Sequence, residues 1–79
     1  MKLDLYMFQC CPFCRRVIAA IEAQGRTDVT LHDIHKSEED RAALLQTGGK
    51  EQVPCLFIDG KPLYESMDII DWLHAHPQA

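Results

Sequence analysis

The residues most able to do chemistry in this chain are Cys11 and Cys14, which are separated by Pro12 and Phe13. Cys11 follows an apolar segment and precedes a proline, so we expect it where a strand ends and a helix begins. Free backbone N–H groups and the helix dipole stabilise a thiolate at such a position. Cys14 would lie one turn further on, within disulfide reach. This arrangement favours thiol–disulfide exchange, which needs a low-pKa nucleophile and a resolving thiol.

The same spacing also occurs in half of a tetrahedral zinc site. A complete site needs a second pair of ligands, but Cys55 stands alone and the four histidines are scattered. We therefore expect redox chemistry and no bound metal. Cys10 adjoins the nucleophile, either as a small residue at the strand end or as a side thiol that forms alternative disulfides. Cys55 is expected to be a buried small hydrophobe.

Composition and charge argue against several other classes of protein. The chain is 47% hydrophobic and 25% charged, as in ordinary globular proteins. Eight basic against twelve acidic side chains give a net charge of -4, whereas nucleic-acid binders usually have a basic excess. No apolar run approaches the ~20 residues that span a membrane. Asp4 would interrupt the apolar core of a signal peptide, so we expect a cytoplasmic protein with no membrane or nucleic-acid partner.

Hydrophobic periodicity and turn signals predict the elements that position the cysteines. Helices are expected from Pro12 to a stop at Gly25, from a cap at Ser37 to Gly48-Gly49, and after a cap at Ser66. Strands are expected over residues 3–8, 29–34, 53–58 and 61–64. The first two strands should be parallel, and the last two should form a hairpin through Asp59-Gly60. The prediction is one α/β domain over residues 1–79, β-α-β-α-β-β-α, with a four-stranded mixed sheet flanked by three helices.

Three of these motifs together resemble the glutaredoxin family, which has a thioredoxin-like fold. Cys11-Pro12-Phe13-Cys14 matches the family's C-P-[YF]-C, and Gln52-Val53-Pro54 matches its T-V-P loop, where the proline is cis. The segment Glu65-Ser66-Met67-Asp68-Ile69-Ile70 falls where the family binds the γ-glutamyl end of glutathione. The residues of this segment are more similar to the E-S-x-x-I pattern of the glutathione transferase N-terminal domain. The resemblance covers essentially the whole chain.

The resemblance implies a glutathione site. Its expected residues are Phe13, Lys50, Gln52, Val53, Pro54, Glu65, Ser66 and Asp68. A helix N-terminus at Ser66 offers N–H groups to a carboxylate, and Glu65 or Asp68 could hold an ammonium group. The plainer alternative is that Ser66 only caps its helix and the two acids only complement the helix dipole.

The remaining contacts of the tripeptide follow from the same resemblance. The backbone of Val53 would pair with the middle of the tripeptide as an added strand does. Phe8 stands where many glutaredoxins have the lysine that meets the glycine carboxylate of glutathione. Lys50, helped by Gln52, is expected to take the place of that lysine.

The sequence therefore predicts a glutaredoxin-type oxidoreductase that reduces protein–glutathione mixed disulfides and protein disulfides. Glutathione would be its cosubstrate, with no bound cofactor, and the protein is expected to be a monomer. Three alternatives stay open: a redoxin reduced by a flavoprotein reductase, an iron–sulfur scaffold or carrier that uses Cys11 and glutathione in a dimer, and a metal-binding module. A transferase proper is not expected, because 79 residues do not accommodate its second, helical domain.

Overall fold

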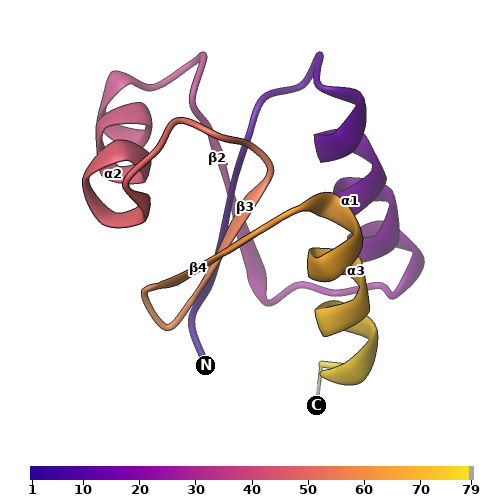
Figure 1. Cartoon of the computed structure of the whole chain (residues 1–79). Helices are drawn as coiled ribbons and strands as arrows, with labels where there is room; N and C mark the ends of the chain where they lie inside the picture. The colour runs from indigo at the N-terminus through magenta and orange to yellow at the C-terminus, as the bar shows by residue number, and fades with distance from the viewer. Residues whose placement is uncertain (79) are drawn as a thin grey trace.

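Seven elements follow one another in the order predicted from the sequence. The computed structural model describes residues 1–78 of the chain. Its elements are β1 (Leu3–Met7), α1 (Pro12–Ala23), β2 (Val29–Asp33), α2 (Glu38–Gly48), β3 (Cys55–Ile58), β4 (Lys61–Tyr64) and α3 (Ser66–Ala75) (Figure 1). The predicted β-α-β-α-β-β-α order is confirmed.

The four strands form one mixed sheet in the order β2-β1-β3-β4. β1 is parallel to β2, with Leu5 opposite Leu31, and antiparallel to β3. β3 and β4 are joined through Asp59 and Gly60, whose φ angles of 49° and 86° are both positive. A two-residue type I′ turn requires this conformation, so the hairpin prediction is confirmed. β2 and β4 are left as the two edges of the sheet.

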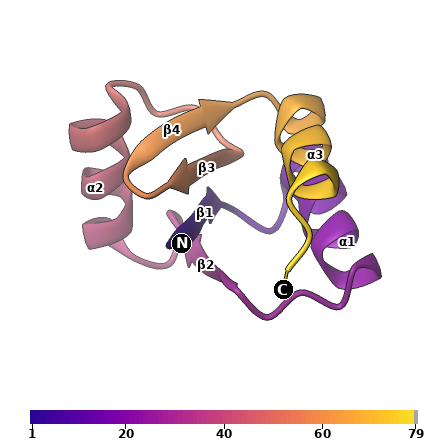
Figure 2. The ribbon, with the colours of Figure 1, turned by 90° about the horizontal axis from the view of Figure 1, so that it is seen from below.

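The helices cover both faces of the sheet, α2 on one side and α1 with α3 on the other (Figure 2). β1 contributes side chains to the apolar clusters on both faces of the sheet, because successive side chains of a strand point to opposite faces. Tyr6 packs with Leu44 of α2 in one apolar cluster. The other cluster lies beneath α1 and α3 and includes Leu3, Leu5 and Met7 of β1 together with Cys11 and Cys14. The cysteine pair is therefore part of this second cluster.

The ends of α2 follow the local signals in the sequence. Ser37 is its N-cap, and the Ser37 hydroxyl oxygen accepts a hydrogen bond from the backbone N–H of Asp40 at 3.2 Å. Gly49 ends the helix with a φ of 83°, a left-handed conformation that favours glycine. Within residues 1–78, no helix has the length and apolar character needed to cross a membrane.

Two predicted boundaries near the third helix were wrong. Ser66 is the first helical residue of α3 and not its cap, because Glu65 occupies the N-cap position with a φ of 72°. β3 begins at Cys55 rather than at Val53, so Val53 and Pro54 belong to the loop that precedes the strand. The loop before β3 is therefore longer than expected, whereas α3 begins one residue earlier than expected.

Arg26 fastens the segment between α1 and β2 to the end of α3. Its side chain is only 2% exposed and forms an ion pair with Asp28 at 2.9 Å. The guanidinium also donates to the backbone carbonyls of Leu73 and His76 at 2.9 and 2.8 Å. The hydrogen bond that Arg26 donates to Asp28 holds the pKa of this carboxyl below its usual range.

Replacing this arginine should destabilise the fold. Arg26→Met is expected to lower the free energy of unfolding by about 3 kcal/mol, because it leaves the buried Leu73 carbonyl and the Asp28 carboxylate without their charged donor. Arg41→Met is a matched control, since Arg41 pairs with Glu51 at the exposed surface and should contribute far less. Urea unfolding of both variants measures the difference. Equal losses in the free energy of unfolding would show that Arg26 contributes no more to stability than a surface ion pair does.

Candidate active site

Cys11 lies at the junction between β1 and α1, as predicted. It is the N-cap of α1, and Pro12 is the first helical residue. The backbone N–H of Cys14 donates to the Cys11 sulfur at an N···S distance of 3.4 Å. The Cys11 backbone N–H donates to the carbonyl of Phe8 at 3.3 Å, which fixes the loop that carries the thiol. The sulfur of Cys11 therefore accepts a hydrogen bond at the N-terminal end of α1.

Cys14 lies deeper in the same site, with no exposed surface. Burial, together with the adjacent Cys11 thiol, raises the pKa of Cys14 to about 12. Such a thiol stays protonated at neutral pH and cannot act first as a nucleophile. The geometry therefore places the two cysteines differently: Cys11 caps α1, and Cys14 lies fully buried one turn further on.

The other two cysteines occupy different environments. Cys55 lies in the cluster beneath α2, on the opposite face of the sheet from Cys14, and is fully buried. Burial raises the pKa of Cys55 to about 11. Cys10 is exposed in the loop before Cys11. Cys55 is thus a buried small hydrophobe, as predicted, and only Cys10 is an accessible third thiol near the site.

A groove of about 400 Å³ lies beside the N-terminus of α1. Three segments form it: the first turns of α1, the loop before β3 and the start of α3. The residues that line it are Phe13, Arg16, Gln52, Val53, Pro54, Glu65, Ser66 and Met67. The Val53–Pro54 peptide bond is cis, as the resemblance implied. Six of the eight residues expected for a glutathione site therefore lie together.

The groove carries charge of both signs. Glu65 is its one acidic side chain, and the amide nitrogen of Gln52 donates to the Glu65 carboxylate at 3.2 Å. Arg16 is its one basic side chain, and its guanidinium lies 5.6 Å from the centre of the Phe13 ring. No side chain caps α3 at Glu65, so the first N–H groups of that helix are available at the groove. The groove thus offers a cation, an anion and free N–H donors to one ligand.

Lys50 and Asp68 do not line this groove. The ammonium group of Lys50 lies 4.4 Å from the centre of the Tyr64 ring. Tyr64 also donates from its hydroxyl to the Lys50 backbone carbonyl at 3.4 Å. Asp68 is exposed in the first turn of α3. The cation inside the groove is Arg16, which was not among the residues expected for the glutathione site.

Comparison with known families identifies this arrangement. Residues 5–79 match the family model described as the glutathione S-transferase N-terminal domain. The chain belongs to this family. It is also 30% identical to a probable glutaredoxin from Synechocystis sp. over 69 residues, which cover 86% of this chain and 77% of that protein. The resemblance to glutaredoxins with a transferase-like third motif is confirmed.

Solved structures agree on the fold of this family member. The thioredoxin-like protein BC3987 superimposes with a TM-score of 0.77 at 22% identity, covering 91% of this chain and 99% of that one. A glutathione S-transferase from Bombyx mori gives a TM-score of 0.82 at 24% identity, with 98% of this chain and 36% of that chain covered. The fold is therefore thioredoxin-like, and the chain spans about a third of the transferase.

The family and the fold together support a thiol-redox or glutathione-related role for this domain. Cys11, the cap of α1, and Cys14 in its first turn fit such a role. Within residues 1–78, no three His, Cys, Asp or Glu side chains are grouped so that they could hold a metal ion.

Proposed function

We propose that this protein is a glutathione-dependent thiol–disulfide oxidoreductase of the glutaredoxin type. The observation that carries the proposal is the position of Cys11. It caps the helix whose first turns form one wall of the groove lined by Phe13, Val53 and Ser66. A tripeptide held in that groove by its backbone and its charged ends would present its sulfur to Cys11.

The proposed reaction is a sequence of two exchanges. The Cys11 thiolate attacks the glutathione sulfur of a protein–glutathione mixed disulfide, the old disulfide bond breaks, and the protein leaves as a thiolate that takes up a proton. A second glutathione thiolate then attacks the Cys11–glutathione disulfide and releases oxidised glutathione. One glutathione thiol is consumed, the protein is released as a thiol, oxidised glutathione is formed from the two glutathione sulfurs, and Cys11 returns to its starting state.

Cys14 offers a second route for disulfides within one protein. After Cys11 attacks such a disulfide, Cys14 loses its proton and attacks the Cys11 sulfur, which frees the reduced protein. The product is a Cys11–Cys14 disulfide, which glutathione then reduces. The high pKa of Cys14 keeps this thiol protonated until a disulfide has formed at Cys11.

We assign the charged ends of glutathione to the groove as follows. The γ-glutamyl carboxylate would accept from the first N–H groups of α3 at Ser66, and its ammonium group would pair with Glu65. Arg16 is the cation placed in the groove for a ligand carboxylate, in preference to Lys50. Glutathione has two carboxylates and one ammonium group, and the groove's donors, cation and anion match them.

The Arg16 assignment makes a kinetic prediction. Arg16→Gln should raise the KM for glutathione about 5-fold, because an exposed charge pair contributes up to about 1 kcal/mol. Lys50→Gln is the matched control, since it removes the same charge outside the groove and should leave the KM nearly unchanged. Steady-state turnover at varied glutathione concentrations measures both. A larger effect for Lys50 than for Arg16 would return the cation role to Lys50.

The choice of reductant tests the proposed function as a whole. The proposed glutathione-dependent function predicts turnover of a glutathionylated substrate when glutathione, glutathione reductase and NADPH are supplied. A flavoprotein thioredoxin reductase with NADPH should not replace them. Turnover with the flavoprotein alone would favour the redoxin alternative. A brown colour after anaerobic purification would favour the iron–sulfur scaffold instead.

A further inference from the structure

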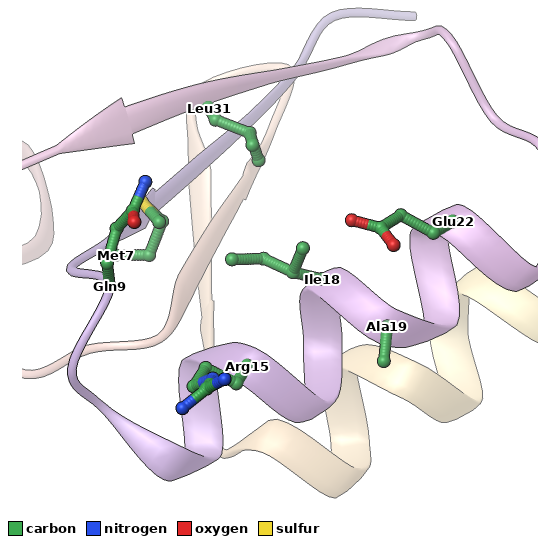
Figure 3. Close-up of a pocket in the computed structure, with 7 residues that line it drawn as sticks. All are labelled: Met7, Gln9, Arg15, Ile18, Ala19, Glu22 and Leu31. Carbon is green, nitrogen blue, oxygen red and sulfur yellow. The ribbon is translucent and has the colours of Figure 1, made fainter.

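A second groove lies on the other side of α1, between that helix and the edge strand β2 (Figure 3). Its volume is about 480 Å³. Met7, Ile18 and Leu31 provide its apolar surface, and Gln9, Arg15, Ala19 and Glu22 complete the lining. Gln9 belongs to the short loop that leads into Cys11, so one end of the groove adjoins the active site. Figure 3 shows Gln9 and Arg15 at this end and Glu22 at the other.

The β2 edge of the sheet is open, whereas the β4 edge is protected. Natural sheets block edge pairing with charged side chains, especially lysine, and with proline. β4 carries Lys61 and Pro62, whereas β2 has the sequence Val-Thr-Leu-His-Asp, with no lysine or proline and a single acidic residue, Asp33, at its end. Leu31 at the centre of β2 is 48% exposed, a large fraction for a leucine. The unprotected edge and the exposed leucine lie along the same groove.

The backbone of β2 is oriented for pairing with a further strand. The N–H of Ile34, just after the strand, donates to the carbonyl of Met7 in β1 at 2.9 Å. Because backbone groups alternate along a strand, the N–H and C=O of Leu31 point the other way, outward from the sheet. An extended peptide could therefore bond to Leu31 while its side chains enter the groove, as in recognition by strand addition.

The charges at the ends of the groove specify which peptide fits. Arg15 and Glu22 are seven residues apart on α1, or about 10.5 Å along the helix axis. An extended chain covers that distance in about three to four residues. A segment with an acidic, an apolar and a basic residue at alternate positions would therefore meet Arg15, the Leu31–Ile18 surface and Glu22 in turn.

We propose that this second groove holds the protein half of a mixed disulfide, as an extended segment that pairs antiparallel to β2. The proposal rests on the proposed function. Arg16 and Arg15 are neighbours in sequence but line different grooves, one on each side of α1. A mixed disulfide has two halves, and the helix that carries Cys11 has a groove for each: glutathione beside Phe13, and the protein segment beside Arg15.

Two synthetic glutathionylated peptides test this pairing. One has the order Cys-Thr-Asp-Thr-Leu-Thr-Lys, and the other ends in Glu in place of Lys. The unmodified protein should turn over the first with a kcat/KM at least ~3-fold higher, as expected for one favourable exposed charge pair. Glu22→Lys should reverse the preference. Glu39→Lys, the same change of charge on α2 at the opposite face, should not.

Further measurements separate this proposal from the proposed function. Cysteine–glutathione disulfide has no segment to fill the groove, so Glu22→Lys and Leu31→Lys should leave its turnover unchanged. Failure with that small substrate would count against the proposed function alone. Fluorescein-labelled peptides with serine in place of cysteine then report docking directly, and should show the same order of Kd. Equal affinity for both peptides would overturn the docking proposal. So would a dimer in sedimentation that Leu31→Lys abolishes, because the edge would then bind a second copy.

Discussion

Cys11→Ser should lower the turnover of every disulfide substrate at least ~10³-fold, because without the covalent nucleophile no mixed disulfide with the protein can form. Cys11 caps α1 and keeps 7% of its surface exposed, whereas Cys14 has no exposed surface. Cys10 is exposed but precedes the helix cap, and Cys14 is buried, so neither replaces Cys11 at the helix N-terminus. The measurement is glutathione-coupled turnover of a glutathionylated protein and of a protein with an internal disulfide.

Cys14→Ser should separate the two activities. Removal of glutathione from a protein needs only Cys11, so this variant should retain most of that activity. Reduction of an internal protein disulfide needs the resolving thiol, so most of it should be lost. Because Cys10 is exposed next to the site and could resolve in place of Cys14, the Cys10→Ser/Cys14→Ser double variant is the control. A Cys14→Ser variant that is inert towards glutathionylated protein would contradict the one-thiol route.

Alkylation should show an equally large difference between the cysteines. With pKa values raised to about 12 and about 11 by burial, Cys14 and Cys55 have few thiolates at neutral pH. At about pH 7 a thiol with these pKa values is ionised to ~10⁻⁵ and ~10⁻⁴. Iodoacetamide should therefore label Cys11 in a Cys10→Ser background at least ~100-fold faster than either buried thiol.

The pH dependence of labelling checks the cause. Raised pKa values mean that the thiolates of Cys55 and then Cys14 form only as the pH rises towards those values, so their labelling should increase steeply in alkali. In denaturant, where burial is lost, all cysteines should react at similar rates. Mass mapping after short exposures gives the order. Labelling of Cys14 before Cys11 in the native protein would reverse their proposed roles.

The sequence predicted those parts of the fold that depend on local chemistry. Cys11-Pro12 marks the start of a helix because proline loses nothing at the first helical position, and Asp59-Gly60 marks a hairpin because both residues tolerate positive φ. Ser37 caps α2 for an equally local reason. These features needed no knowledge of distant contacts, and the structure contains all three.

The start of α3 could not be predicted in this way. Serine is a favoured N-cap, which made Ser66 the expected residue. Glu65 instead takes the cap position with a φ of 72°, a conformation that side chains rarely adopt and that local preference does not favour. Gln52, thirteen residues earlier in the chain, donates to its carboxylate. The start of α3 thus involves a contact between Gln52 and Glu65, from two segments that meet only in the folded protein.

The candidate site shows the same division. Six of its eight expected residues line one groove, but Lys50 turns to the ring of Tyr64. A loop side chain of this length has no periodicity from which its direction could be inferred. Arg16 is different, because it follows Phe13 by three residues on a helix and such residues share a face. The spacing of Phe13 and Arg16 could be seen in the sequence, but only the structure shows that both residues line the groove.

Histidines illustrate the part that only tertiary contacts reveal. His32 is one of the four scattered histidines, and its two ring nitrogens lie 2.9 and 3.1 Å from carboxylate oxygens of Asp4 and Asp40. Its ring also stacks on Tyr6. These partners come from β1 and α2, so no pattern within the β2 segment could have indicated them.

The most direct test of the account is to trap the proposed covalent intermediate. The Cys10→Ser/Cys14→Ser variant, treated with oxidised glutathione and mapped by mass spectrometry, should carry one glutathione on Cys11. Added reduced glutathione should remove it and regenerate the free thiol. A protein that stays unmodified, or that carries glutathione only on Cys55, would contradict a glutathione-dependent exchange at Cys11.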